Sequence, residues 1–301
     1  MYMKCFKLIT ILSLFLFIGF SQANTSVRAW SYADGKTFKA LILAWDAKTD
    51  LVTLSDGGDS TYTVKRTELS LADQAYVRQW FNHREKLDKK LKETGGEMLY
   101  LQSTGTWNSD YYVYKPSTYK ADGTAPLLVL FSSSGTGYRM MLRHFEAAEK
   151  SGMVLVTLDY YSNRTMGAES DKHFTELLPQ LETISHDPKK LFLGGDSGGA
   201  LRAYQYSATF DRPWAGIYAN GGWLGRNYTR KYRSNMRVAM INGHKDRNAL
   251  HFTKADTDHL TKIRQCNVAL FSFEGGHQLA PTDAQLEAFN WLLEKTASEV
   301  E

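Results

Sequence analysis

Short runs of consecutive apolar residues alternate with stretches of helical periodicity from residue 98 to the C-terminal region. The runs carry no charge, as expected for strands that are buried on both faces of a sheet. Strands that alternate with helices form parallel pairs, and the helices cover both faces of the sheet. The sequence therefore predicts an α/β domain with a mostly parallel sheet, with strands at 127–131, 153–158, 191–193, 215–219, 238–241 and 268–271.

The segment after the run at 191–193 carries the clearest catalytic pattern. Gly195, Ser197 and Gly199 form a G-x-S-x-G sequence between a buried strand and a predicted helix over 200–208. This placement is typical of a nucleophile elbow, where the serine occupies a strained turn and its hydroxyl projects above the sheet. The N-terminus of the following helix favours developing negative charge there. We therefore identify Ser197 as the candidate nucleophile.

The same five residues, 195–199, also match the serine motif of trypsin-like proteases. That family needs an all-β chain with a catalytic histidine upstream of the serine. The α/β pattern of this chain does not fit, and Ala200 stands where the protease motif has proline. We therefore exclude this class.

An acid and a base are expected after the late strands, because elbow hydrolases carry their triad in the order serine, acid, histidine. His277 follows the last strand and a glycine turn, so it is the candidate base. Asp246 follows the strand at 238–241 and is the favoured acid, while Asp256 and Asp258 are alternatives. These two lie further from the strand end, so a position on a helix surface is expected for them. The acid would orient the imidazole and stabilise its protonated form.

Residues 98 to about 295 resemble the α/β-hydrolase superfamily, nearest to its secreted esterases and polyhydroxybutyrate-depolymerase-like members. The likeness is carried by the elbow and by the segments 184–188, 243–246 and 275–277. It implies two backbone N–H groups that hold an oxyanion, which we place at Gly198 and Ser134. The chain departs from the family in the loop after the strand at 127–131, which supplies the second donor. This loop reads Phe131-Ser-Ser-Ser-Gly, where family members usually have His-Gly. Because the donor is a backbone group, the departure need not remove it.

Residues 27–81 have a different pattern, with short predicted strands at 37–45, 51–54 and 61–64 and a helix that begins at Ser70 with a capping-box sequence. They resemble the SLA1 homology domain 1 family at turn and core positions such as Trp30, Phe38, Tyr76 and Trp80. The resemblance implies a small, strongly bent sheet with a terminal helix, and the eukaryotic members bind short peptides. A peptide or protein partner is therefore expected for this module.

The charge-rich segment 82–97 is predicted to be a linker helix or the tail of the preceding one, and the hydrolase domain to span 98–297. No candidate catalytic residue lies before Met98. The small module is therefore expected to be separable from the hydrolase. The alternative is that its aromatic residues pack permanently against the hydrolase.

Residues 1–23 have the form of a secretory signal peptide. Lys4 and Lys7 precede an apolar run at 8–20, and Ser21 and Ala23 supply the small residues of a cleavage site. The run is shorter than the roughly 20 residues that a membrane-spanning helix needs. We therefore predict a cleaved leader and a secreted or periplasmic protein without membrane association. Cleavage would leave Cys266 as the only cysteine, so no disulfide could form within the mature chain.

The charge balance and the histidine spacing exclude two further classes. The full sequence has 36 basic and 32 acidic residues, a net charge of +4. Nucleic-acid binders carry a concentrated basic surface, so no nucleic-acid partner is expected. No pair of histidines has the H-x-x-x-H spacing of a metallohydrolase, so neither a metal nor another cofactor is expected.

Together these patterns predict a serine hydrolase that cleaves a small-molecule or polymeric carboxylic ester through an acyl-enzyme. Tyr160 and Trp223 follow two of the strands and are placed near the substrate pocket, where aromatic rings suit a sugar or an aryl acyl group. A serine peptidase of the same fold is the alternative enzyme. A non-catalytic binding protein built on a hydrolase scaffold is the alternative from another class.

Overall fold

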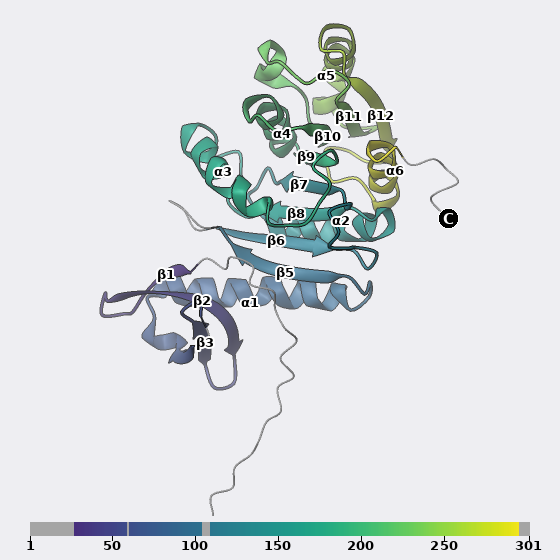
Figure 1. Ribbon diagram of the computed structural model, residues 1–301. Coiled ribbons are helices and arrows are strands. Elements are labelled where there is room, and N and C mark those ends of the chain that lie inside the picture. The colour runs from purple at the N-terminus through teal and green to yellow at the C-terminus, as the bar shows by residue number, and fades with distance from the viewer. Residues whose placement is uncertain (1–26, 59, 104–108, 295–301) are drawn as a thin grey trace, which may run out of the picture.

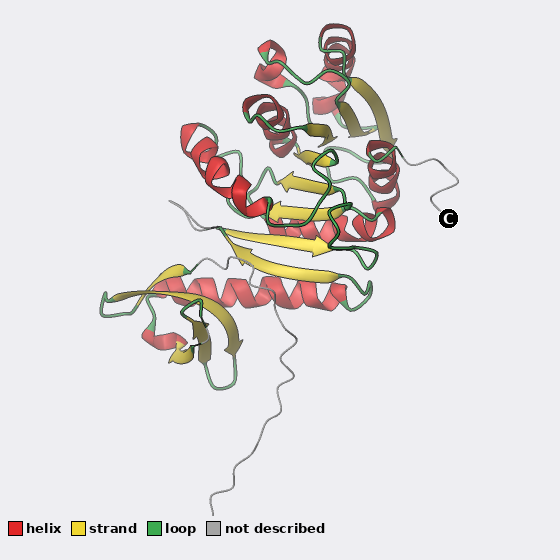
Figure 2. Ribbon diagram, viewed as in Figure 1, coloured by secondary structure: helices red, strands yellow, loops and turns green. Residues whose placement is uncertain are grey.

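The computed structural model describes residues 27–58, 60–103 and 109–294. The chain forms a large sheet covered by helices and a separate small sheet near its N-terminus, as Figures 1 and 2 show. The predicted leader at 1–23 and the last residues of the predicted hydrolase domain, 295–297, lie outside the described residues. Within the described ranges, no helix is long and apolar enough to cross a membrane.

The large sheet has eight strands in the order β12-β11-β10-β9-β7-β8-β6-β5. The strands from β12 to β8 run parallel to their neighbours, and β6 and β5 continue the sheet antiparallel at one end. This arrangement confirms the predicted mostly parallel sheet. The strands are β5 (Glu97–Gln102), β6 (Asp110–Lys115), β7 (Leu127–Phe131), β8 (Val154–Leu158), β9 (Leu191–Asp196), β10 (Trp214–Asn220), β11 (Arg237–Gly243) and β12 (Asn267–Phe273).

Helices cover both faces of this sheet and form a core on each. Successive side chains of a strand point to opposite faces, so each buried strand contributes to both cores. In β7, Leu127, Val129 and Phe131 pack in a core with the helices α3 and α4, whereas Leu128 and Leu130 pack in a second core with α2 and α6. The helices of this region are α2 (Gly137–Ser151), α3 (Ala168–Leu181), α4 (Gly198–Thr209), α5 (Arg247–Asp258) and α6 (Thr282–Leu292), with short turns η2 (Gly225–Thr229) and η3 (His259–Ile263).

The small sheet is antiparallel, with its four strands in chain order, and encloses its own core around Trp30, Val52 and Leu54. Ser70 caps the following helix, and its hydroxyl accepts a hydrogen bond from the backbone N–H of Asp73 at 3.2 Å, which confirms the predicted helix start. The elements are β1 (Arg28–Ser31), β2 (Thr37–Asp46), β3 (Leu51–Ser55), β4 (Thr61–Lys65), the turn η1 (Arg66–Glu68) and α1 (Leu71–Leu91).

Helix α1 is continuous across residues 81 and 82, so the charge-rich segment begins as the tail of the same helix. Figure 1 shows α1 between the small sheet and strand β5. Its C-terminal half packs on the large domain, where Leu87 is buried in the core that contains α2. The His83 ring stacks on Tyr138 of α2 at 3.5 Å, and Tyr100 of β5 donates its hydroxyl proton to Asp88 at 2.5 Å. Helix α1 therefore packs against both the small sheet and the large domain.

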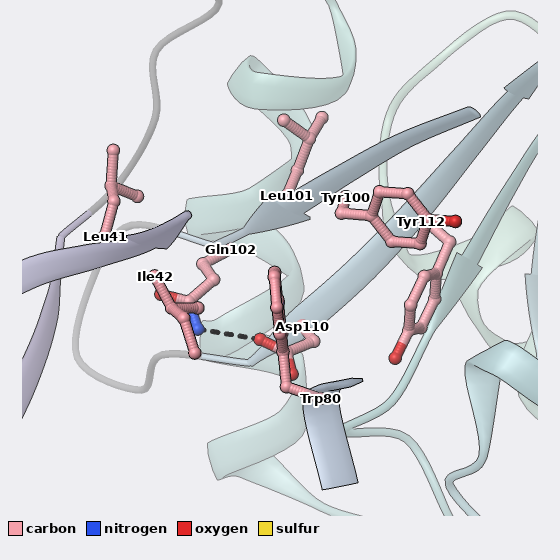
Figure 3. Close-up of a pocket in the computed structure, with 8 residues that line it drawn as sticks. All are labelled: Leu41, Ile42, Trp80, Tyr100, Leu101, Gln102, Asp110 and Tyr112. Atoms are coloured by element: carbon pink, nitrogen blue, oxygen red, sulfur yellow. Dashed lines mark hydrogen bonds between the residues drawn. The ribbon is translucent and has the colours of Figure 1, made fainter. Parts of the chain in front are cut away.

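A small pocket of about 30 Å³ lies where the two sheets meet, and its lining comes from β2, α1, β5 and β6 (Figure 3). In this lining, the half-buried Asp110 residue accepts hydrogen bonds from the Tyr76 hydroxyl at 2.9 Å and from Gln102 Nε2 at 2.8 Å. Burial raises the pKa of the Asp110 carboxyl. A cavity of this size holds about one water molecule.

A chain that begins at Glu97 lacks the small sheet and α1. We expect it to be insoluble or to unfold at a much lower temperature than the chain that includes them. Removal of α1 takes Leu87 from the core, where loss of a leucine side chain costs about 2–5 kcal/mol. It also leaves the Asp110 carboxylate without the hydrogen bond from the Tyr76 hydroxyl. Thermal unfolding of this chain and of a chain that begins at Val27 measures the effect. Equal melting temperatures would contradict it and favour separable domains.

Candidate active site

The turn between β9 and α4 has the strained geometry of a nucleophile elbow. Ser197 has φ +49° and ψ −114°, a conformation that is unfavourable for a residue with a side chain. Gly199 has no room for a side chain, since a Cβ atom there would collide with the carbonyl oxygen of Phe131 in β7. The helix therefore starts directly against the sheet, with Ser197 at its N-terminal end.

Ser197, His277 and Asp246 form one hydrogen-bonded chain. His277 Nε2 lies 2.9 Å from Ser197 Oγ, and His277 Nδ1 lies 2.8 Å from Asp246 Oδ2. The Asp246 side chain is 1% exposed, whereas that of His277 is 34% exposed. A buried carboxylate on Nδ1 fixes the tautomer that leaves Nε2 free to accept the serine proton. This geometry can activate the serine hydroxyl, and the His277 side chain is open to solvent.

The Asp246 carboxylate divides its two oxygens between the triad and the protein backbone. Oδ2 faces His277, and Oδ1 accepts hydrogen bonds from the N–H groups of Asn248 and Ala249, both at 3.1 Å, as the N-cap of α5. Helix capping therefore holds the carboxylate in place. Asp258, by contrast, lies on the surface of α5 with Lys254 and Lys262, as expected.

Asn220, at the end of β10, holds the loop that carries His277. Its Nδ2 donates to the carbonyl oxygen of Gln278 at 2.9 Å, and its Oδ1 accepts from the N–H of Ala280 at 2.8 Å. The Asn220 carbonyl oxygen also accepts from the N–H of Ser197 at 2.9 Å. One buried residue therefore links the serine turn to the histidine loop. No sequence pattern reveals this role of Asn220, because its side-chain contacts join segments that are remote along the chain.

The expectation that Asp256 lies on a helix surface is wrong. The residue is fully buried, and its Oδ2 accepts a hydrogen bond from the N–H of Leu224 at 2.8 Å. Its Oδ1 contacts the Tyr228 hydroxyl. Burial raises the pKa of this carboxyl. Asp256 lies on the inward face of α5, and it fixes the loop after β10 that carries Trp223.

Replacement of Asp256 by asparagine is expected to lower the free energy of unfolding by about 1–3 kcal/mol, the cost of leaving a buried polar group without its partner. The amide has only one acceptor oxygen for the two donors that Asp256 now serves, Leu224 N–H and the Tyr228 hydroxyl. Urea unfolding measures the difference. Asp258→Asn is the matched control on the same helix and should change stability by less than about 0.5 kcal/mol. Equal stabilities of the two variants would contradict the role assigned to Asp256.

The loop after β7, where Ser134 was placed as an oxyanion donor, is tied to the elbow. The backbone N–H and the hydroxyl of Ser133 donate to the Asp196 carboxylate at 3.0 and 2.7 Å. Gly198 begins α4, so its N–H has no acceptor within the helix. The N–H of Ser134 lies 3.3 Å from the hydroxyl oxygen of Ser132, a long contact that it would exchange in order to bind an oxyanion. Asp196 therefore positions the loop, a role that the sequence analysis missed.

One of the two predicted pocket aromatics lies beside the triad. The Trp223 ring lies 6.5 Å from the His277 ring and stacks on Phe252 of α5 at 5.6 Å. Tyr160 packs instead against Tyr161 and His173, with ring centroids 5.2 and 4.4 Å away. Phe252 was not singled out from the sequence, although its place in the second turn of the helix that follows Asp246 is a signal that could have found it.

Comparison with protein-family models and with curated protein sequences gives no match. The SLA1 homology domain 1 resemblance of the N-terminal module therefore stays a prediction. Many solved structures, in contrast, match the fold.

Three of these structures illustrate the likeness. Esterase LipW from Mycobacterium marinum superimposes with a TM-score of 0.56 at 14% identity, over 75% of this chain and 90% of that one. For the fluorophosphonate-binding serine hydrolase FphF of Staphylococcus aureus the values are 0.52, 12%, 66% and 98%. For a dienelactone hydrolase from Anabaena variabilis they are 0.50, 14%, 67% and 99%. At identities this low the superpositions show a shared fold alone, and this chain therefore has the α/β-hydrolase fold.

Proposed function

We propose that this chain is a serine hydrolase that cleaves carboxylic esters through an acyl-enzyme. The observation that carries the proposal is the continuous hydrogen-bonded chain from buried Asp246 through His277 to Ser197. In such a site Ser197 Oγ attacks the ester carbonyl carbon while His277 Nε2 takes the hydroxyl proton. The alcohol leaves with that proton, and water then releases the acid from Ser197. The names of the structural neighbours, which include esterases and serine hydrolases, agree with this reaction class.

The stacked pair of Trp223 and Phe252 favours substrates with a flat, apolar group next to the ester. The Trp223 ring lies near that of His277 and stacks on the ring of Phe252, which is 37% exposed. Stacking on aromatic rings adds to the gain from burying apolar area. We propose an aryl or sugar ester as the substrate class, either as a small molecule or as part of a polymer.

The N-terminal segments suggest where the enzyme works. We propose that residues 1–23 export the protein and are removed, and that the small sheet is an SLA1-type module. The module would present its solvent-facing side to a peptide or protein partner. Its other side packs through α1 on β5, at the end of the sheet opposite β12.

Labelling by a fluorophosphonate probe tests the proposed chemistry, because such probes react with an activated serine. The purified protein should be labelled, and digestion should map the label to Ser197. A panel of acyl esters and the corresponding anilides, which report on peptidase activity, then separates the two enzyme candidates. Labelling at Ser197 with faster turnover of esters supports the proposal, and faster turnover of anilides favours a peptidase. Absence of both labelling and turnover would favour the non-catalytic binding protein.

A further inference from the structure

The side chain of Asn163 lies against the residue that follows the serine. A Cβ atom built on Gly198 would lie 2.6 Å from Asn163 Cγ and closer still to Oδ1, so the Asn163 amide fills the space that a side chain at Gly198 would take. Gly198 supplies the first N–H of α4 and one of the two assigned oxyanion donors. Asn163 is itself an exposed residue, as a group that lines an open site must be.

The backbone around Asn163 is attached to the loop that was assigned the second donor. Its N–H donates to the carbonyl oxygen of Ser133 at 2.9 Å, and Ser162 pairs with Ser134 in an isolated antiparallel bridge. The Asn163 amide therefore lies against one of the two assigned donors, and its backbone is bonded to the loop that carries the other.

A buried guanidinium binds the backbone of the segment that contains Asn163. Arg202 of α4 is 1% exposed, and its side chain donates to the carbonyl oxygens of Ser162 at 2.9 Å and Thr165 at 3.3 Å. The Thr165 hydroxyl in turn accepts from the N–H of Ser162 at 2.8 Å. The backbone on both sides of Asn163 is therefore anchored, and none of these hydrogen bonds uses its side-chain amide.

Within the described residues, the side-chain amide of Asn163 makes no hydrogen bond. A primary amide carries two donors and an acceptor oxygen, and rotation about the Cβ–Cγ bond can present either end. An amide that is held beside Gly198 without a partner has its N–H groups available for a ligand. The ligand group nearest to Gly198 N–H in the proposed reaction is the carbonyl oxygen of the substrate.

We propose that Asn163 is a third oxyanion donor, a catalytic residue in addition to the triad and the two backbone N–H groups. This inference rests on the proposed function of the site. When Ser197 Oγ bonds to the carbonyl carbon, the π electron pair moves to the carbonyl oxygen and the serine proton passes to His277 Nε2. Asn163 Nδ2–H then donates to the negative oxygen. When the intermediate collapses, that pair re-forms the C=O bond and the alcohol leaves with the proton from His277.

Because the charge develops only in the tetrahedral intermediate, Asn163→Ala should lower kcat by about 10²-fold. KM should change by less than about threefold. Affinity for a boronic acid, which mimics the intermediate, should fall by a factor similar to that of kcat. Asn163→Asp keeps the shape but places a carboxylate beside the oxyanion, so its kcat should fall further. Arg164→Ala, on the same segment, is the matched control and should leave kcat unchanged.

Gly198→Ala provides an independent test, because it keeps the backbone N–H but puts a methyl group where the Asn163 amide lies. It should lower kcat by a factor similar to that of Asn163→Ala, and the double variant should be no slower than either single one. A kcat of Asn163→Ala within about threefold of wild type, or a loss confined to KM, would overturn the inference. Fluorophosphonate labelling of the wild type at Ser197 keeps this outcome distinct from failure of the proposed function.

Discussion

Replacement of Ser197 by alanine is expected to lower kcat by about 10⁵-fold or more while the protein stays folded. Without Oγ no acyl-enzyme can form, and loss of the nucleophile removes nearly all of what a triad contributes to the rate. The change is small in volume, and the residue is only half-buried. Ester hydrolysis measured together with thermal unfolding tests both parts of this prediction.

The strain at Ser197 adds a second expectation for the same variant. The backbone strain is the same in the variant, because alanine has to adopt the same positive φ of 49° as serine. The variant loses only the hydroxyl that lies 2.9 Å from His277 Nε2. Stability should therefore change little, and fluorophosphonate labelling should disappear. Ser207→Ala, which removes a hydroxyl from the same helix about three turns away, is the matched control and should keep the wild-type rate. Full activity of the purified Ser197→Ala protein would contradict the mechanism.

The sequence was sufficient to predict the large sheet and the proximity of Ser197, His277 and Asp246 for a physical reason. Strands buried on both faces have to be apolar at every position, so they are visible as continuous runs without any knowledge of their neighbours. The ends of parallel strands meet at one edge, so Ser197, Asp246 and His277 could be placed together from their positions after strands alone. The hydrogen bonds at 2.8 and 2.9 Å agree with that reasoning.

Asp256 shows where the same reasoning was incomplete. It was assigned to a helix surface because it lies further from the strand end than Asp246. However, it lies two helical turns after Ala249 and one turn before Leu260, and both of these residues are buried. That spacing places Asp256 on the inward face of the helix. The helical periodicity was a better guide than the distance from the strand end, and hydrogen bonds from Leu224 and Tyr228 satisfy the carboxylate there.

Contacts between remote segments explain what no pattern could reveal. Ser133 and Asp196 are 63 residues apart, and only the parallel pairing of β7 and β9 brings them within hydrogen-bond distance. The packing of α1 is hidden for another reason. Its C-terminal half is rich in charge, and Leu87 is the one fully buried residue there, so an isolated reading of the segment favours a solvated linker. The position of Asn163 beside Gly198 is likewise a contact between segments that are remote along the chain.

Asp246→Asn is expected to lower kcat by about 10⁴-fold, the second-largest effect of any single change. The amide can still accept the hydrogen bonds that cap α5 through one oxygen, so the fold should persist. Its NH₂ group then faces His277 Nδ1 and stabilises the tautomer with the proton on Nε2, which cannot accept the serine proton. Steady-state hydrolysis of the best ester measures the loss. Asp258→Asn, an exposed carboxylate on the same helix, should keep the wild-type rate. If Asp258→Asn were the slow variant and Asp246→Asn the normal one, the assignment of the acid would be wrong.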